Sequence, residues 1–64
     1  MNKEWLENYY KNAGYTCLGW VNISTDAQEA YQKSENKQWH EIGRNLHLVA
    51  CHDLKVYVMI DSGD

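Results

Sequence analysis

Sixty-four residues with a formal net charge of −3 limit both the size and the partners of this protein. The length allows one domain at most, and 44% hydrophobic with 23% charged residues is typical of a globular chain rather than a disordered one. The nine acidic and six basic residues are scattered, so the chain has neither the basic stripe of a nucleic-acid-binding protein nor the dense acidic array of a DNA mimic. We therefore expect a single compact domain over residues 1–64, with nucleic-acid binding unlikely.

The first predicted helix covers residues 3–13. Asn2 is a suitable N-cap, and Gly14 suits the position that follows a helix C-terminus. An apolar stripe recurs at helical spacing and comprises Trp5, Leu6, Tyr9, Tyr10 and Ala13. The stripe must dock against another surface, and a sheet is the simplest candidate.

A strand and a second helix are predicted next. Residues 15–23 are rich in aromatic, aliphatic and β-branched side chains, which favours a strand. Thr25 and Gln28 match a capping box, and we extend the helix that begins there to Ile42, just before a glycine. The alternative makes residues 37–42 a strand, with residues 43–45 forming a three-residue hairpin loop.

Residues 46–52 and 54–60 are the remaining apolar runs, and only Asp53 separates them. This spacing predicts a tight antiparallel hairpin. The predicted order is helix, strand, helix, strand, strand: a small α+β domain with a three-stranded mixed sheet packed with two helices. The first two strands are either parallel neighbours or have the third strand between them.

Both faces of this predicted sheet carry large apolar side chains. The purer aliphatic set contains Val21, Leu48, Val56 and Val58, and we assign it to the core beneath the helices. The other set contains Leu18, Trp20, Val49, Tyr57 and Met59, which is too apolar for a solvated face. Either the first helix crosses over to cover this second face, or both helices share one side and the second face binds a partner.

Three layers rarely fit into so short a chain, so the two-layer form is favoured. It predicts a contiguous partner-binding patch formed by Leu18, Trp20, Tyr57 and Met59. If the first helix covers that face instead, the working surface is expected on the exposed side of the second helix, around Glu29 and Lys33.

Candidate catalytic and metal-binding residues are few. His47, Cys51, His52 and Cys17 could be metal ligands, but strand alternation divides them between two faces, and no paired Cys or His motif is present. The same geometry opposes a disulfide between the two cysteines. A Cys51 and His47 nucleophile pair, oriented by Glu41 or Asp53, lacks an evident cleft. We predict no catalytic residue, no metal and no cofactor.

The aromatic residues are three Trp and five Tyr with no Phe, a bias found at protein interfaces. With no signal peptide and no apolar run long enough to span a bilayer, we expect a cytoplasmic protein with reduced cysteines. Small acidic chains of this kind are typical of stoichiometric inhibitors and adaptors, including those of phages and mobile elements. We predict a non-catalytic protein-binding module; the alternative is a small homodimeric regulator, ahead of a nucleic-acid-binding protein or an enzyme.

Overall fold

The computed structural model describes residues 2–61, which fold into two helices and one four-stranded sheet. In chain order the elements are α1 (Lys3–Asn12), β1 (Thr16–Trp20), α2 (Thr25–Lys33), β2 (Lys37–Gly43), β3 (Leu46–Cys51) and β4 (Val56–Asp61). The strand order is β1-β4-β3-β2, with β1 parallel to β4 and the other two pairs antiparallel. The α+β class and the mixed sheet are confirmed, but the sheet has four strands and not three.

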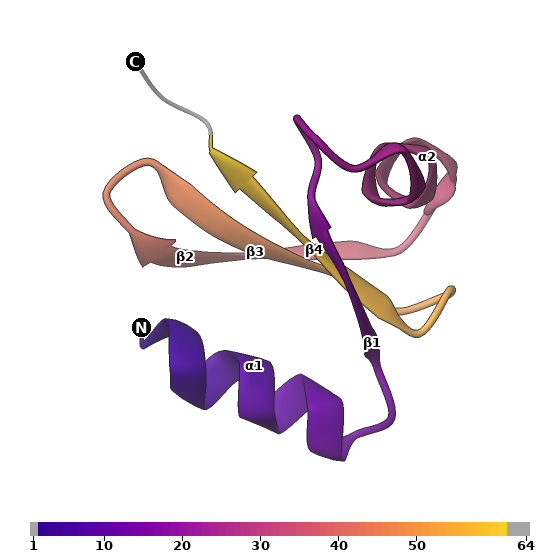
Figure 1. Ribbon diagram of the computed structural model, residues 1–64. Coiled ribbons are helices and arrows are strands. Elements are labelled where there is room, and N and C mark those ends of the chain that lie inside the picture. The colour runs from indigo at the N-terminus through magenta and orange to yellow at the C-terminus, as the bar shows by residue number, and fades with distance from the viewer. Residues whose placement is uncertain (1, 62–64) are drawn as a thin grey trace.

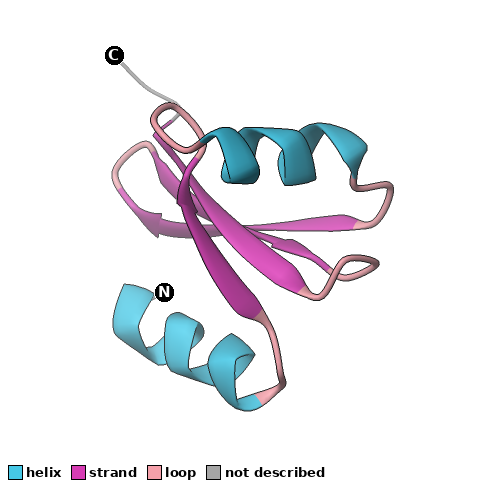
Figure 2. Cartoon of the chain, turned by 45° about the vertical axis from the view of Figure 1, so that its right-hand side comes forward, coloured by secondary structure: helices cyan, strands magenta, loops and turns pink. Residues whose placement is uncertain are grey.

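The two helices cover opposite faces of the sheet (Figures 1 and 2). On the α1 side the buried cluster consists of Leu6, Tyr10, Leu48, Ala50 and Tyr57. On the α2 side it consists of Ala27, Val49 and Val58, with Leu18, Val21, Tyr31 and Ile60 packed around it. The favoured two-layer arrangement is therefore wrong, and the three-layer alternative holds. Strands of five to seven residues make a sheet narrow enough for one short helix to cover each face.

The second helix ends at Lys33, and the predicted extension to Ile42 is wrong. Ser34 leaves the helical region (φ −65°, ψ 130°), and its Oγ donates to Asp53 Oδ1 at 2.6 Å. The backbone N–H of Glu35 donates to the other carboxylate oxygen of Asp53 at 2.9 Å. A carboxylate from a distant loop thus binds the chain where it leaves α2, and the chain continues as β2, as the alternative interpretation had it.

The hairpin between β3 and β4 is longer than the sequence indicated. Its loop covers residues 52–55 and includes Lys55 at a positive φ of 56°. The pairing is antiparallel, as predicted, and β4 lies between β1 and β3, in agreement with one of the two predicted arrangements. However, the register pairs Val49 with Val58, so Val58 lies on the opposite face from Leu48 and the predicted grouping of these two residues is wrong.

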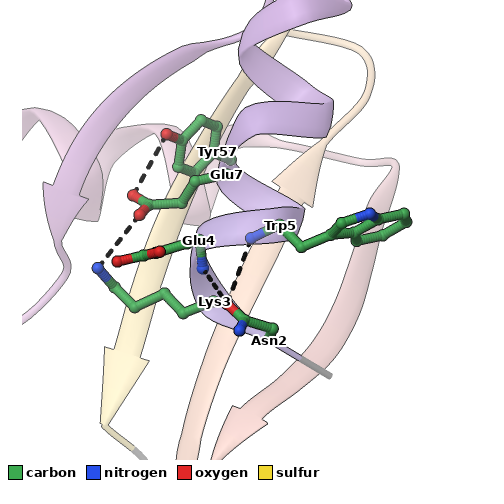
Figure 3. Close-up of polar contacts among 6 residues, drawn as sticks. All are labelled: Asn2, Lys3, Glu4, Trp5, Glu7 and Tyr57. Atoms are coloured by element: carbon green, nitrogen blue, oxygen red, sulfur yellow. Dashed lines mark hydrogen bonds and ion pairs between the residues drawn. The ribbon is translucent and has the colours of Figure 1, made fainter.

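The helix caps show which local predictions were correct. Asn2 Oδ1 accepts hydrogen bonds from the backbone N–H groups of Glu4 at 2.8 Å and Trp5 at 3.3 Å, which confirms the predicted N-cap (Figure 3). Gly14 follows the C-cap of α1 at a φ of 92°, also as expected. The cap of α2 is Ser24 and not Thr25, because Ser24 Oγ accepts from the Ala27 N–H at 3.2 Å.

Candidate protein-binding surface

The four residues predicted to form a binding patch do not share one exposed surface. Tyr57 is fully buried and Met59 is 6% exposed. Leu18 packs against the α2-side cluster, whereas Tyr57 belongs to the α1-side cluster. Trp20 is half-buried and pairs with Met59 in the β1–β4 ladder. The expected contiguous patch is therefore absent.

The break between Leu18 and Trp20 originates at Gly19. This residue has a φ of 92°, and the register of β1 against β4 shifts between Cys17 and Trp20. A bulge of this kind interrupts the two-residue alternation on which the predicted patch depended. A single glycine within an otherwise apolar run was the available signal.

Tyr57 is held in the interior by α1. Its hydroxyl donates to Glu7 Oε1 at 3.4 Å, and the other carboxylate oxygen of Glu7 lies 3.2 Å from Lys3 Nζ (Figure 3). Burial, followed by the neighbouring Cys17 and Glu7, raises the pKa of Tyr57 well above its usual range. Tyr57 is thus a neutral core residue beneath α1, and it is not available to a partner in this conformation.

The two most exposed large aromatic side chains lie instead on α1. Trp5 and Tyr9 are 60% and 56% exposed, and their rings stack with centroids 5.9 Å apart and planes inclined by 12°. Figure 3 shows the Trp5 side chain projecting away from Glu7 and Tyr57. We call Trp5 and Tyr9 the α1 aromatic pair.

The α1 aromatic pair has a firm base in the core. Tyr9 makes an edge contact with Tyr10 at a centroid distance of 5.2 Å, and Tyr10 in turn meets Tyr15 at 4.9 Å. Tyr10 is buried within the α1-side cluster. The exposed rings are therefore supported by packed aromatic neighbours.

The sequence contains a signal for this surface. Trp5 and Tyr9 form one i, i+4 pair, and Leu6 and Tyr10 form the adjacent one. All four belong to the five-residue stripe predicted to dock against the sheet, but α1 buries only Leu6 and Tyr10. Two neighbouring pairs make a stripe wider than the face that this ten-residue helix buries against the sheet, so one pair stays outside.

The surface expected around Glu29 and Lys33 is exposed on α2, but none of the exposed large apolar side chains belongs to this helix.

A second aromatic group lies at the β2 edge of the sheet. There the ring of Trp39 makes edge contacts with Tyr31 at 5.9 Å and with His47 at 5.4 Å, and Trp39 is 46% exposed.

Histidine and tyrosine side chains form a polar network on the α1 side. Tyr10 Oη lies 2.7 Å from His40 Nε2, and Tyr15 Oη lies 2.7 Å from His52 Nδ1. His52 Nε2 is 2.9 Å from Gln38 Oε1. Because these polar atoms bond one another, the network connects α1 and the loops to β2.

The residues considered for catalysis or metal binding are dispersed. Cys51 is buried on the α2 side, where burial raises the pKa of its thiol, while Cys17 is exposed and pairs with Tyr57 on the other face. His47 contacts Trp39, whereas His52 contacts Tyr15. Within residues 2–61 there is no group of three metal-ligating side chains and no pocket.

Comparisons with protein-family models, curated proteins and solved structures found no significant match for this chain. Neither helix in the described part of the chain has the length and apolar character needed to cross a membrane.

Proposed function

We propose that this protein is a small non-catalytic protein-binding module that acts as a stoichiometric inhibitor or adaptor through the α1 aromatic pair. The observation that carries the proposal is the exposure of Trp5 and Tyr9 as a stacked pair on the outside of a packed helix. Trp and Tyr are enriched among the residues that dominate protein interfaces, because they bury a large area with few rotatable bonds.

The geometry of the pair favours recognition of a partner with a preformed apolar groove or pocket. The two rings are already stacked, so binding would immobilise little side-chain freedom. Around them α1 carries both signs of charge, with Glu4 and Lys11 exposed near opposite ends of the helix. An aromatic centre with a charged surround matches the composition of transient interfaces, where polar residues form the rim.

The proposal is tested by affinity capture from the cells that encode the protein, with wild type and two variants as bait. Trp5→Ala removes the larger ring of the pair. Ile23→Ala is the matched control, because Ile23 is another exposed large apolar residue that lies outside both helices. A protein retained by wild type and by Ile23→Ala, but lost with Trp5→Ala, is the expected partner.

Titration calorimetry with that protein then measures stoichiometry and affinity. We expect a fixed small-integer stoichiometry and a loss of at least about 2 kcal/mol, or roughly thirtyfold in Kd, for Trp5→Ala. Equal affinities for wild type and Trp5→Ala would contradict the proposed site. Turnover of the captured protein by catalytic amounts of this chain would contradict the non-catalytic role.

A further inference from the structure

One edge of the sheet is long and open. β2 forms that edge with seven residues and no proline, and its own register shift lies at its end, between Glu41 and Gly43. The opposite edge strand, β1, has five residues and is interrupted in its middle by the Gly19 bulge. Short and bulged edges resist pairing with other chains, but a long edge exposes unpaired backbone groups. β2 is therefore the strand on which a further strand can form a ladder.

The β2–β3 register identifies the backbone groups that point outward. Asn36 and His52 are opposite each other, and the Asn36 carbonyl accepts from the His52 N–H at 2.9 Å. Hydrogen-bonded and non-hydrogen-bonded pairs alternate in an antiparallel ladder, so Gln38 and His40 bond to β3. The N–H and C=O groups of residues 37, 39 and 41 consequently face away from the sheet.

The side chains at these three positions are self-complementary. Lys37, Trp39 and Glu41 lie on the α2 face of β2, since Trp39 is opposite Val49 of the α2-side cluster. An antiparallel copy of β2 centred on Trp39 places Lys37 opposite Glu41 of the second copy, and the reverse pair forms by symmetry. The two Trp39 rings then face each other across the centre, an arrangement that stabilises antiparallel strands.

Other registers are less favourable. Centring the pair on residue 37 or on residue 41 places like charges directly opposite each other, which is destabilising. Centring it on residue 38 or on residue 40 places a charged side chain opposite Trp39. One of the three outward positions, 37, 39 and 41, then has none of these positions of the second copy opposite it. Only the register centred on Trp39 pairs all three outward positions and both charges.

Lys37 is anchored beside the end of α2 and keeps one donor for this contact. Its ammonium group donates to the carbonyl oxygens of Tyr31 and Ser34 and lies 5.1 Å from the centre of the Tyr31 ring. An ammonium group has three N–H donors, and these two carbonyl oxygens use two of them. One donor is left for a carboxylate, and Glu41 is exposed.

We propose that two copies of this protein pair antiparallel along β2, centred on Trp39, into a continuous sheet. The two-fold axis is perpendicular to the sheet, so both α1 helices lie on the same side. This inference stands independently of the α1 aromatic pair, although the dimer would present two such pairs to one side.

Sedimentation velocity over a concentration series tests the dimer with a charge exchange. Glu41→Lys and Lys37→Glu each place like charges opposite each other, so each variant alone should raise the dimer Kd at least about tenfold. An equimolar mixture of the two restores opposite charges at both pairs and should form a heterodimer within about threefold of the wild-type Kd. Glu29→Lys is the control, because it makes the same charge change on exposed α2 and should leave the Kd unchanged.

Two further measurements keep the test decisive if Lys37→Glu does not fold. Glu41→Pro removes an outward N–H without touching the β3 ladder, so it should yield a folded monomer. Isotope-filtered NMR of the wild type should show contacts between the α protons of Gln38 and His40 of the other copy. Three results would overturn the proposal. They are a wild type that stays monomeric at millimolar concentration, equal effects of Glu41→Lys and Glu29→Lys on the Kd, and an edge that binds only extended peptides of other proteins.

Discussion

Tyr10 and His40 join helix α1 to the edge strand β2 through a hydrogen bond of 2.7 Å between Oη and Nε2. Burial, with a smaller contribution from His52, lowers the pKa of His40 below its ordinary value of 6.5. Burial also raises the pKa of Tyr10, followed by the effects of Tyr15 and Tyr9. Both partners are therefore neutral at pH 7, and burial keeps the imidazole uncharged at the contact between α1 and β2.

This relationship predicts a pH-dependent stability. Because the pKa of His40 is lower in the folded protein than in the unfolded chain, the unfolded chain binds more protons as the pH falls towards and below 6.5. The stability that neutral His40 contributes is fully present above its unfolded pKa. It is lost as the pH falls to the pKa that His40 has in the folded protein. Urea unfolding at about pH 8 and about pH 5 measures how far the free energy of unfolding falls between the two. This fall should be smaller for His40→Gln than for wild type. Equal decreases would show that His40 is not the group responsible.

The neighbouring residues Trp5 and Leu6 should differ sharply in their effect on stability. Leu6 is 2% exposed, so Leu6→Ala should lower the free energy of unfolding by about 2–5 kcal/mol. Trp5→Ala should change it by less than about 1 kcal/mol, because Trp5 lies outside the core. Chemical denaturation of the two variants beside wild type measures both. A large loss for Trp5→Ala would indicate that this ring is part of the core.

Gly19→Ala should destabilise the fold by about 1–3 kcal/mol. A Cβ at this position has room, since its nearest contact is Ser24 Cβ at 3.9 Å, so the cost arises from the φ of 92°. Thermal unfolding of the variant provides the measurement. An unchanged midpoint would mean that β1 runs through residue 19 without a bulge.

The two cysteines should react at very different rates. Cys17 is exposed, whereas Cys51 is fully buried and burial raises the pKa of its thiol. With iodoacetamide under native conditions, intact mass should show one adduct quickly, and peptide mapping should place it on Cys17. The second adduct should appear only with denaturant. Rapid modification of Cys51 in the folded protein would contradict the burial of β3.

Features governed by local chemistry could be predicted from the sequence. The N-cap at Asn2, the glycine after α1 and the start of α2 depend on neighbouring residues only, and these were placed to within a residue. The end of α2 depends on Asp53, which bonds Ser34 and Glu35 across the fold. No local pattern contains that contact, so the strand at 37–43 could be weighed only as an alternative.

The patch predicted on the sheet is wrong for a related reason. A one-residue register change moves every side chain of a strand to the other face. The loop 52–55 and the bulge at Gly19 both change which residues of β4 and β1 lie on each face. The sequence did indicate that both faces of the sheet are apolar and need covering. Which element covers each face, and hence which aromatic residues stay outside, depends on the path of α1.

The most direct measurement uses the three tryptophans as separate reporters. In a ¹⁵N–¹H correlation spectrum, Trp5 reports the α1 aromatic pair, Trp39 the β2 edge and Trp20 the patch first expected on the sheet. On titration with the captured protein partner, we predict that the Trp5 indole resonance shifts or broadens while that of Trp20 stays in place. Perturbation of Trp20 with no change at Trp5 would contradict the assignment of the binding surface to the α1 aromatic pair.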